Sequence, residues 1–447
     1  MPTETASAIA KSPLARTACC ALWLVLFCGA RIEAQLATPP DSSARHSATT
    51  LTLGGMAFGV LTRAAPAYNG ESLTELQLVQ PVLAIGVARN SWSFVGMANA
   101  EGFTLKRGEL NAGIYGEGYV DRRHPHTLVH EAMLTWMPRT PRDVTNGSSL
   151  AFSLSAGRGF VPFGSDDPMM RPLEKYPVNH HHAQILERMQ AIAATRLTRG
   201  ARSAAVEVAI FNGDEPAGPF HGPRWNRFGD SWAIRGTIQP GRQLELSVSE
   251  ARVTSPELQQ GGAFNHRQRH ASIRFDRAPT RPGTRYLLAE WARTDERTNG
   301  LRAFRYHSAL LEAGYGWRGA TAAMRIEQTD RGEEGRLADP FRAAVGHVDF
   351  QILGVTQWSV ATVALQTPSI ARPFPVARIA GFVELSQARP RSLRLPSAFE
   401  PAAFYGADRI WSVSAGIRVH AGFMRHRMGR YGVMGAVDHT GTKHHGT

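Results

Sequence analysis

Cysteine is almost missing from this sequence. Only three cysteines occur in 447 residues, and Cys19, Cys20 and Cys28 all lie close to the N-terminus. Exported domains of this size often contain disulfides, because the compartments outside the cytoplasm permit them. The region after residue 28 can form none, which favours a fold closed by backbone hydrogen bonds, as a barrel is.

Long apolar runs are missing as well. The longest run, residues 18–30, has about 13 residues, fewer than the ~20 that a helix needs to cross a bilayer. After residue 34, apolar stretches are short and are interrupted by Gly, Arg, Glu or Ser. Because only helices and closed barrels satisfy every backbone group within lipid, the chain is either soluble in the periplasm or crosses a membrane as strands.

The short apolar run has the flanks of a secretory signal. Lys11 and Arg16 precede it, and the segment 31–34 leads from it to Gln35. A charged region, a short apolar region and a small residue at the cleavage site together indicate a signal peptide. We predict that residues 1–34 are removed by cleavage after Ala34; a membrane anchor that stays attached is the alternative.

Two polar segments flank the remaining chain. Residues 35–50 contain two prolines and are expected to form a flexible lead-in. Residues 434–447 are rich in Gly, His and Thr and are expected to form a C-terminal tail. Many outer-membrane barrels end on an aromatic residue, so we place the end of the last strand near 431–433, with Tyr431 as that aromatic residue.

Lysine is scarce although the chain is strongly basic. Lys and Arg together number 50 against 37 Asp and Glu, which gives a net charge of +13, and only four of the basic residues are lysines. A basic chain can bind nucleic acid, but the signal peptide argues against that partner. Arginines on a pore wall or on a lipid-facing rim, where they attract anions or anionic head groups, are the better interpretation.

Enzyme motifs are also missing. The sequence has no His-Glu-x-x-His, no phosphate-binding glycine loop and no Gly-x-Ser-x-Gly. His130-Glu131 lacks the second histidine that a zinc protease would need. We therefore predict that the protein is not an enzyme.

The sequence does contain period-two alternation of apolar and polar residues. Val206, Val208 and Ile210 alternate with Glu207 and Ala209, and the same pattern occurs at 244–249 and 411–420. Period two places one set of side chains on each face of a strand. The apolar set faces a core in a soluble sandwich and faces lipid in an outer-membrane barrel, so this pattern alone leaves both folds open.

Three features favour the barrel. The alternating texture continues from 51 to 433 without a change in composition, whereas soluble cores usually split into domains before that length. Turn residues recur often, and longer polar loops separate every second pair of strands. We predict an all-β protein, a single closed antiparallel transmembrane β-barrel of about 16–18 strands in a bacterial outer membrane, in contact with lipid and inserted by the barrel-assembly machinery.

The expected strands are 51–63, 73–88, 91–100, 110–121, 127–137, 148–158, 185–197, 202–211, 231–239, 243–252, 267–276, 284–294, 303–317, 319–329, 345–355, 358–367, 374–387 and 410–430. The last of these is long enough for two strands. Segment 185–197 also fits a helix, because Ile185, Met189 and Ile192 have helical spacing.

Two groups of histidines are the most unusual feature. Asp121, His124, His126 and His130 lie close together, and a second group at 180–182 includes His180 and His181. Imidazole and carboxylate groups that converge on one point bind copper or zinc. A polar network, in which these residues hydrogen-bond to arginines, is the structural alternative.

The segment 165–184 and several arginines are candidates for a pore constriction. The segment is either a solvated outer loop, which we favour slightly, or an inward loop that places Asp166, Asp167 and Arg171 in the pore. Arginines on the polar faces of strands are expected to line the lumen, namely Arg235, Arg274, Arg293 and Arg325. Acidic residues at similar positions would pair with them, and the excess of arginine leaves a modest preference for anions.

The segment 121–126 (DRRHPH) resembles a group of uncharacterised, porin-like bacterial outer-membrane barrel proteins, whose pattern is Asp-Arg-x-His-Pro-His-Asp. The double histidine of 176–185 and the sequence FNGDEP at 211–216 fit the same family, over about 115–330. Thr127 replaces the last Asp of the pattern, and 176–185 lacks the Asp-Ser of the family. The resemblance implies the fold and the location.

These observations lead to a functional hypothesis. We expect a porin-like channel for small solutes, anionic or neutral, with no cofactor. The alternatives are a metal-binding outer-membrane protein that uses the histidine groups and copper or zinc, and a barrel with a structural role and no channel.

Overall fold

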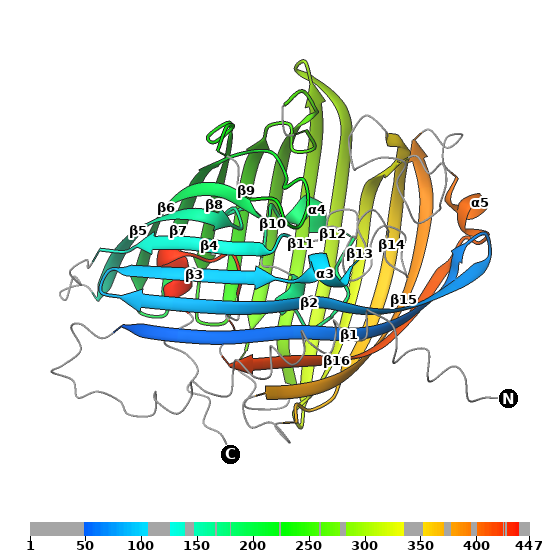
Figure 1. Cartoon of the computed structure of the whole chain (residues 1–447), viewed down its shortest axis with the longest axis horizontal. Helices are drawn as coiled ribbons and strands as arrows, with labels where there is room; N and C mark the ends of the chain where they lie inside the picture. Colours follow the sequence, from blue (N-terminus) through cyan, green and yellow to red (C-terminus); the bar gives the residue numbers. More distant parts are fainter. Residues whose placement is uncertain are drawn as a thin grey trace.

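The computed structural model describes residues 49–105, 126–138, 147–165, 168–178, 180–222, 225–258, 261–277, 283–334, 352–370, 377–394, 400–422, 424 and 427–437. These residues form one closed barrel of antiparallel strands, in which each strand pairs with its neighbours in sequence and β1 pairs with β16 (Figure 1). The predicted all-β barrel is therefore confirmed.

The strands are β1 (Thr50–Tyr68), β2 (Glu71–Arg89), β3 (Trp92–Asn99), β4 (Val129–Trp136), β5 (Ser148–Gly159), β6 (Arg188–Arg199), β7 (Arg202–Phe211), β8 (Ser231–Gln239), β9 (Leu244–Val253), β10 (Asn265–Asp276), β11 (Gly283–Thr298), β12 (Leu301–Trp317), β13 (Ala320–Glu334), β14 (Ile352–Gln366), β15 (Ala377–Arg394) and β16 (Ile410–Gly422). Short helices are α3 (Glu101–Thr104), η2 (Pro168–Met170), α4 (His180–Ala183), α5 (Pro401–Tyr405) and η4 (Gly432–Val437).

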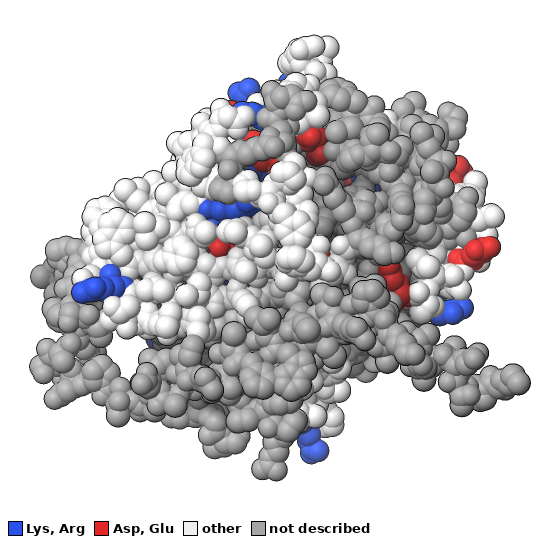
Figure 2. All heavy atoms as spheres, in the orientation of Figure 1, with Lys and Arg blue, Asp and Glu red and all other residues white. Residues whose placement is uncertain are grey.

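The two faces of each strand have opposite polarity. On β7, Val206, Val208 and Ile210 are 44–47% exposed, whereas Glu207 between them is 2% exposed. A soluble sandwich would bury the apolar set, so this arrangement identifies the barrel: the outer wall is apolar and the inner wall is charged. Figure 2 agrees, because the described atoms on the face in view are mostly uncharged.

The expected strands differ from the observed ones in detail. The single strand β14 (Ile352–Gln366) joins the end of the predicted segment 345–355 to the segment 358–367, whereas 345–351 and 110–121 lie outside the described residues. Segment 185–197 forms strand β6, so the helical alternative is wrong. The sixteen strands agree with the lower of the two predicted numbers.

The connections at the two ends of the barrel differ in length. Short turns at 90–91, 200–201, 240–243 and 318–319 lie at one end, together with the start of β1 and the end of β16. Most of the long connections lie at the other end, namely 100–128, 160–187, 212–230, 335–351 and 395–409. Outer-membrane barrels have short periplasmic turns and long extracellular loops, so this architecture belongs in the bacterial outer membrane, with the long loops outside.

No helix in the described ranges is long and apolar enough to cross a membrane. The predicted signal peptide at 1–34 and most of the lead-in at 35–50 lie outside the described residues, as does the tail from 438 onward. These boundaries stay predictions.

The last strand ends earlier than expected. β16 stops at Gly422, so Tyr431 is not part of the wall. Gly422 has φ +63°, and a Cβ there would lie 2.2 Å from the carbonyl oxygen of Leu53 on β1. Only glycine allows the chain to turn this close to the neighbouring strand. Residues 432–437 form η4 inside the barrel, which Figure 1 shows in red and which contacts β5 and β6.

Candidate functional site: the barrel lumen

The connection between β5 and β6 folds into the lumen. Leu173, Lys175 and Tyr176 in this segment are at most 4% exposed. The amides of Glu174 and Lys175 donate to the carboxylate of Glu384 on β15, at 2.6 and 3.1 Å. Strands β13–β15 lie across the barrel from β5, so the described part of the segment spans the lumen, and for these residues the solvated-loop interpretation of 165–184 is wrong. We call residues 160–187 the inserted loop.

Further contacts fix the inserted loop to the distant wall. The amide of Val178 donates to Glu327 at 2.7 Å, and Arg325 donates to the carbonyl of Lys175 at 2.6 Å. Nζ of Lys175 donates to Ser412 on β16 at 3.0 Å. A buried loop has no sheet partners for its backbone, so side chains of the inner wall satisfy these groups instead.

Arg171 lies in the lumen as the inward-loop interpretation requires. Its Nη2 is 3.4 Å from Oε2 of Glu290 on β11, and it donates to Ser165 at 2.6 Å. Nε2 of His270 on β10 lies 3.1 Å from the same carboxylate. Asp166 and Asp167 lie outside the described residues. Arg171 is thus neutralised by a wall carboxylate, and a constriction role for it stays a prediction.

Three of the four predicted wall arginines face the lumen, and each has an acidic partner. Arg235 makes two hydrogen bonds to Glu207, at 2.6 and 2.8 Å. Arg325 donates to Glu312 at 2.7 Å, and neither side chain is exposed. The third pair joins Arg274 to Asp276 at 2.5 Å. The inner wall therefore carries paired charges at these positions, without an arginine excess.

Arg293 lies on the outer wall of β11, so the prediction that it lines the lumen is wrong. It lies two residues after Trp291, whose side chain is 41% exposed on the outer wall, so period two puts Arg293 on the outer wall as well. Its Nη2 is 2.7 Å from Oδ2 of Asp295. The prediction assumed that a charged side chain on a strand faces the lumen. Near the end of a barrel strand the outer face leaves the hydrocarbon region and also tolerates charge.

The C-terminal segment after β16 also enters the lumen. Arg427 makes two hydrogen bonds of 2.7 Å to Glu245 on β9, and Arg430 donates to the same carboxylate at 2.9 Å. The amide of Val433 donates to Ser153 on β5 at 3.1 Å. We call residues 427–437 the C-terminal plug. It was not predicted, because these contacts join residues about 180 to 280 positions apart.

The inserted loop and the C-terminal plug meet inside the barrel. The Tyr431 hydroxyl donates to Glu131 on β4 at 2.8 Å and accepts from the Phe160 amide at 3.1 Å. Met428 packs in one apolar cluster with Phe160 and with Phe58 of β1. At Gly159 a Cβ would lie 2.2 Å from the Tyr431 hydroxyl, so glycine makes room for this contact. The loop enters from the long-loop end and the plug from the short-turn end.

One loop carboxyl has an unusual ionisation. Burial, together with the nearby charge of Glu384, raises the pKa of Glu174 to about 7, although Arg418 opposes the shift. Oε1 of Glu174 lies 3.4 Å from Nη1 of Arg418, which also covers the ring of Phe58. The contact between the inserted loop and β16 therefore depends on a group that titrates near neutral pH.

The first histidine group forms carboxylate contacts. His126 Nδ1 lies 2.9 Å from Glu101 of α3, and His130 Nδ1 lies 2.6 Å from Glu187. Burial raises the pKa of Glu187, but the hydrogen bond and charge of His130, with His126 and Arg158, outweigh burial and lower this pKa to about 2. This arrangement matches the structural-network alternative, with glutamates in addition to an arginine.

The predicted metal ligands are only partly described. Asp121 and His124 lie outside the described residues, and of His180 and His181 only the backbone, in α4, is described. The neighbouring His182 contacts Thr294 on β11, at 2.9 Å. Among the described residues, no group of three or more His, Cys, Asp or Glu is arranged to hold a metal ion. Copper or zinc binding stays an untested alternative to the expected absence of a cofactor.

Comparisons with solved structures find bacterial outer-membrane proteins. No family model matches the chain, so the family resemblance of its motifs stays a prediction, and no curated protein matches. Solved structures that match include OprB of Pseudomonas putida (10% identity, TM-score 0.45, covering 84% of this chain and 94% of that one). The outer membrane channel DcaP of Acinetobacter baumannii (7%, 0.43, 87% and 100%) and OmpF of Salmonella typhi (14%, 0.43, 82% and 97%) also match. These values describe a general likeness between large barrels and assign no solute.

Proposed function

We propose that the protein is a porin-like outer-membrane channel for small polar solutes, and that the inserted loop and the C-terminal plug hold it in a closed state. The main support for this proposal is the charged lining of the inner wall. This wall carries hydrogen-bonded charges such as Arg235 with Glu207 and Arg325 with Glu312. Barrels of this strand number enclose an aqueous lumen, and charged side chains are suited to a wall that water can reach.

The pairing of charges on the inner wall affects which solute charge the channel would favour. Every luminal arginine predicted from sequence has a carboxylate within hydrogen-bond distance, so the wall offers alternating charge and little net field. Selection of anions by arginine requires an excess of positive charge along the path. We therefore favour neutral or zwitterionic solutes over the anions that the composition suggested.

The closed state has a plain physical basis. The plug binds Glu245 through Arg427 and Arg430, and the loop binds Glu384 through two amides. Both anchors are hydrogen bonds rather than wall strands, so either segment can leave without opening the barrel. Planar-bilayer recordings of the refolded chain test the proposal. Brief openings of a low-conductance channel are expected, and a complete absence of current in the wild type and in plug-weakened variants would refute it.

One observation favours a second function. The filled lumen is also what a structural barrel without a channel would have, since Arg325 and Glu312 are fully buried under the inserted loop. The same recordings separate the two functions. A structural barrel conducts neither before nor after Arg427 and Arg430 are replaced by glutamine, whereas a closed channel gains current on replacement.

A further inference from the structure

Arginines gather on the outer wall of β9–β12 toward the long-loop end. Strand pairing places Arg252 directly opposite Arg267, and Arg269 directly opposite Arg293. Arg305 on β12 follows in the next strand, opposite Asp295. Like charges that face each other across two strands destabilise a sheet. Two such pairs side by side concentrate positive charge on this part of the outer wall.

Among the described residues, two carboxylates lie within this group. Glu250 is 2.6 Å from Arg267 and 3.7 Å from Arg269. Asp295 is 2.7 Å from Arg293 and 2.6 Å from Arg305. The side chains of Arg267 and Arg269 remain 47% and 39% exposed toward the exterior. We call the five arginines the outer arginine patch; it carries an excess of positive charge on a surface that faces the membrane.

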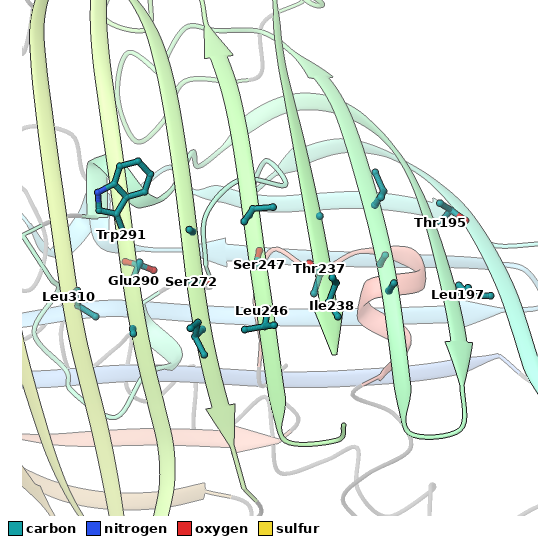
Figure 3. Close-up of a pocket in the computed structure, with 18 of the residues that line it drawn as sticks. Thr195, Leu197, Thr237, Ile238, Leu246, Ser247, Ser272, Glu290, Trp291 and Leu310 are labelled. Atoms are coloured by element: carbon teal, nitrogen blue, oxygen red, sulfur yellow. The ribbon is translucent and has the colours of Figure 1, made fainter. Parts of the chain in front are cut away.

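An apolar groove adjoins the outer arginine patch. On each of these strands, the residue two positions nearer the short-turn end lies on the same outer face and is apolar. These residues are Val248 beside Glu250, Ala271 beside Arg269 and Trp291 beside Arg293. Val248, Ala271 and Trp291 are among the residues that line a groove of about 900 Å³ on the outer wall. Figure 3 shows Trp291 with other lining residues of this groove, such as Leu246 and Ile238. Small side chains at Gly236 and Ala271, between larger apolar neighbours, leave the wall hollow here.

We propose that the groove and the outer arginine patch together form a binding site for an anionic, phosphate-bearing lipid of the outer leaflet, whose phosphate charge is not neutralised by a cationic headgroup such as choline. The guanidinium groups would bind the phosphate, since their fork of donors matches phosphate oxygens. The acyl chains would fill the groove below. The long-loop end faces the outer leaflet, so the patch lies at headgroup depth and the groove lies in the hydrocarbon.

Charge also decides against a second copy of the chain as the occupant. Two copies that met through this face would bring two outer arginine patches together, and like charges that face each other across an interface disfavour association. A phosphate lipid supplies the opposite charge and the apolar volume at once. The site lies outside the lumen, so its existence does not depend on the channel function.

The test is lipid retention measured by native mass spectrometry. The refolded full chain in detergent is titrated with lipid A, which carries two phosphates, and separately with phosphatidylcholine. The patch variant is R267Q/R269Q/R293Q. The matched control is R389Q/R391Q, because these arginines are also exposed on the outer wall, but on β15, away from the groove. The groove variant is G236L/A271L, and heat-modifiable migration on a gel verifies that each variant is folded.

The proposal predicts that lipid A is retained in preference to phosphatidylcholine. The patch variant should bind lipid A at least about tenfold more weakly, the groove variant should also bind it more weakly, and the control should match the wild type. Equal binding by wild type and patch variant would overturn the proposal, and so would equal loss in the control. A lipid-free dimer that the patch variant separates would identify a second copy as the occupant instead.

Discussion

The hydroxyl of Tyr431 donates a 2.8 Å hydrogen bond to Glu131, a residue 300 positions earlier in the chain. Tyr431 follows the last strand and Glu131 lies on β4, so this contact ties the C-terminal plug to the wall near the point where the inserted loop begins. Tyr431→Phe should remove it and leave a buried carboxylate without that donor, at a cost of about 1–3 kcal/mol. Single-channel recordings should show more frequent openings than in the wild type.

The control for this change is Tyr315→Phe. Tyr315 is 50% exposed on the outer wall of β12, and its hydroxyl is far from the plug. It should leave the opening frequency unchanged. If Tyr431→Phe and Tyr315→Phe behave alike, the Tyr431 contact does not hold the plug.

The pH dependence of opening should follow Glu174. Its pKa is about 7 in the closed state against an ordinary 4.5, so the closed state binds more protons between these values. Stabilisation of the closed state is complete below pH 4.5 and is lost as the pH rises through 7. Glu187, with a pKa of about 2, stays charged throughout this window. Conductance recorded from pH 5 to pH 8 should therefore increase.

Glu174→Gln provides the test of that assignment. Glutamine keeps the shape of the protonated acid and cannot ionise, so the variant should remain closed at pH 8 and show a flat profile. A profile in the variant that rises as steeply as in the wild type would assign the pH dependence to another group.

The buried pair of Arg325 and Glu312 should be costly to break. Neither side chain is exposed, and their atoms approach to 2.7 Å. Glu312→Gln removes the hydrogen-bonded counter-charge of a buried guanidinium, and breaking a buried ion pair typically costs ~3–5 kcal/mol. Urea unfolding of the refolded barrel should show this loss. Glu250→Gln breaks the partly exposed contact to Arg267 and should cost no more than ~1 kcal/mol.

Replacement of His130 separates the metal hypothesis from the structural network. In the network, His130→Ala removes the closest partner of Glu187 and should lower the unfolding free energy by about 2 kcal/mol. We expect no stoichiometric binding when the wild type is titrated with Zn²⁺ or Cu²⁺ in a calorimeter. Binding at one ion per chain that is lost in His130→Ala would establish the metal site instead.

The sequence predicts the strands well because their signal is local. Alternation of Val206, Glu207 and Val208 assigns the two faces of β7 without reference to any other strand. The same rule fails for Arg293, because polarity near the end of a strand no longer separates lumen from exterior. Trp291, two residues earlier, carried the signal that would have corrected the prediction.

The contents of the lumen were much less predictable. The inserted loop is held by Glu327 and Glu384, which on their strands look like any other inward-facing acid. The C-terminal plug depends on Glu245, about 180 residues before Arg427. Such contacts arise only once the barrel has closed, so no local pattern encodes them.

The most direct test of the closed channel fixes the plug covalently. The native cysteines all precede residue 29. The Val433 amide lies 3.1 Å from Oγ of Ser153, so we expect the two thiols of S153C/V433C to lie near each other and to link plug and wall on oxidation. Planar-bilayer recordings of the oxidised protein should show no openings, and a reductant should restore them. Identical currents before and after reduction, with the disulfide verified by mass spectrometry, would contradict the account.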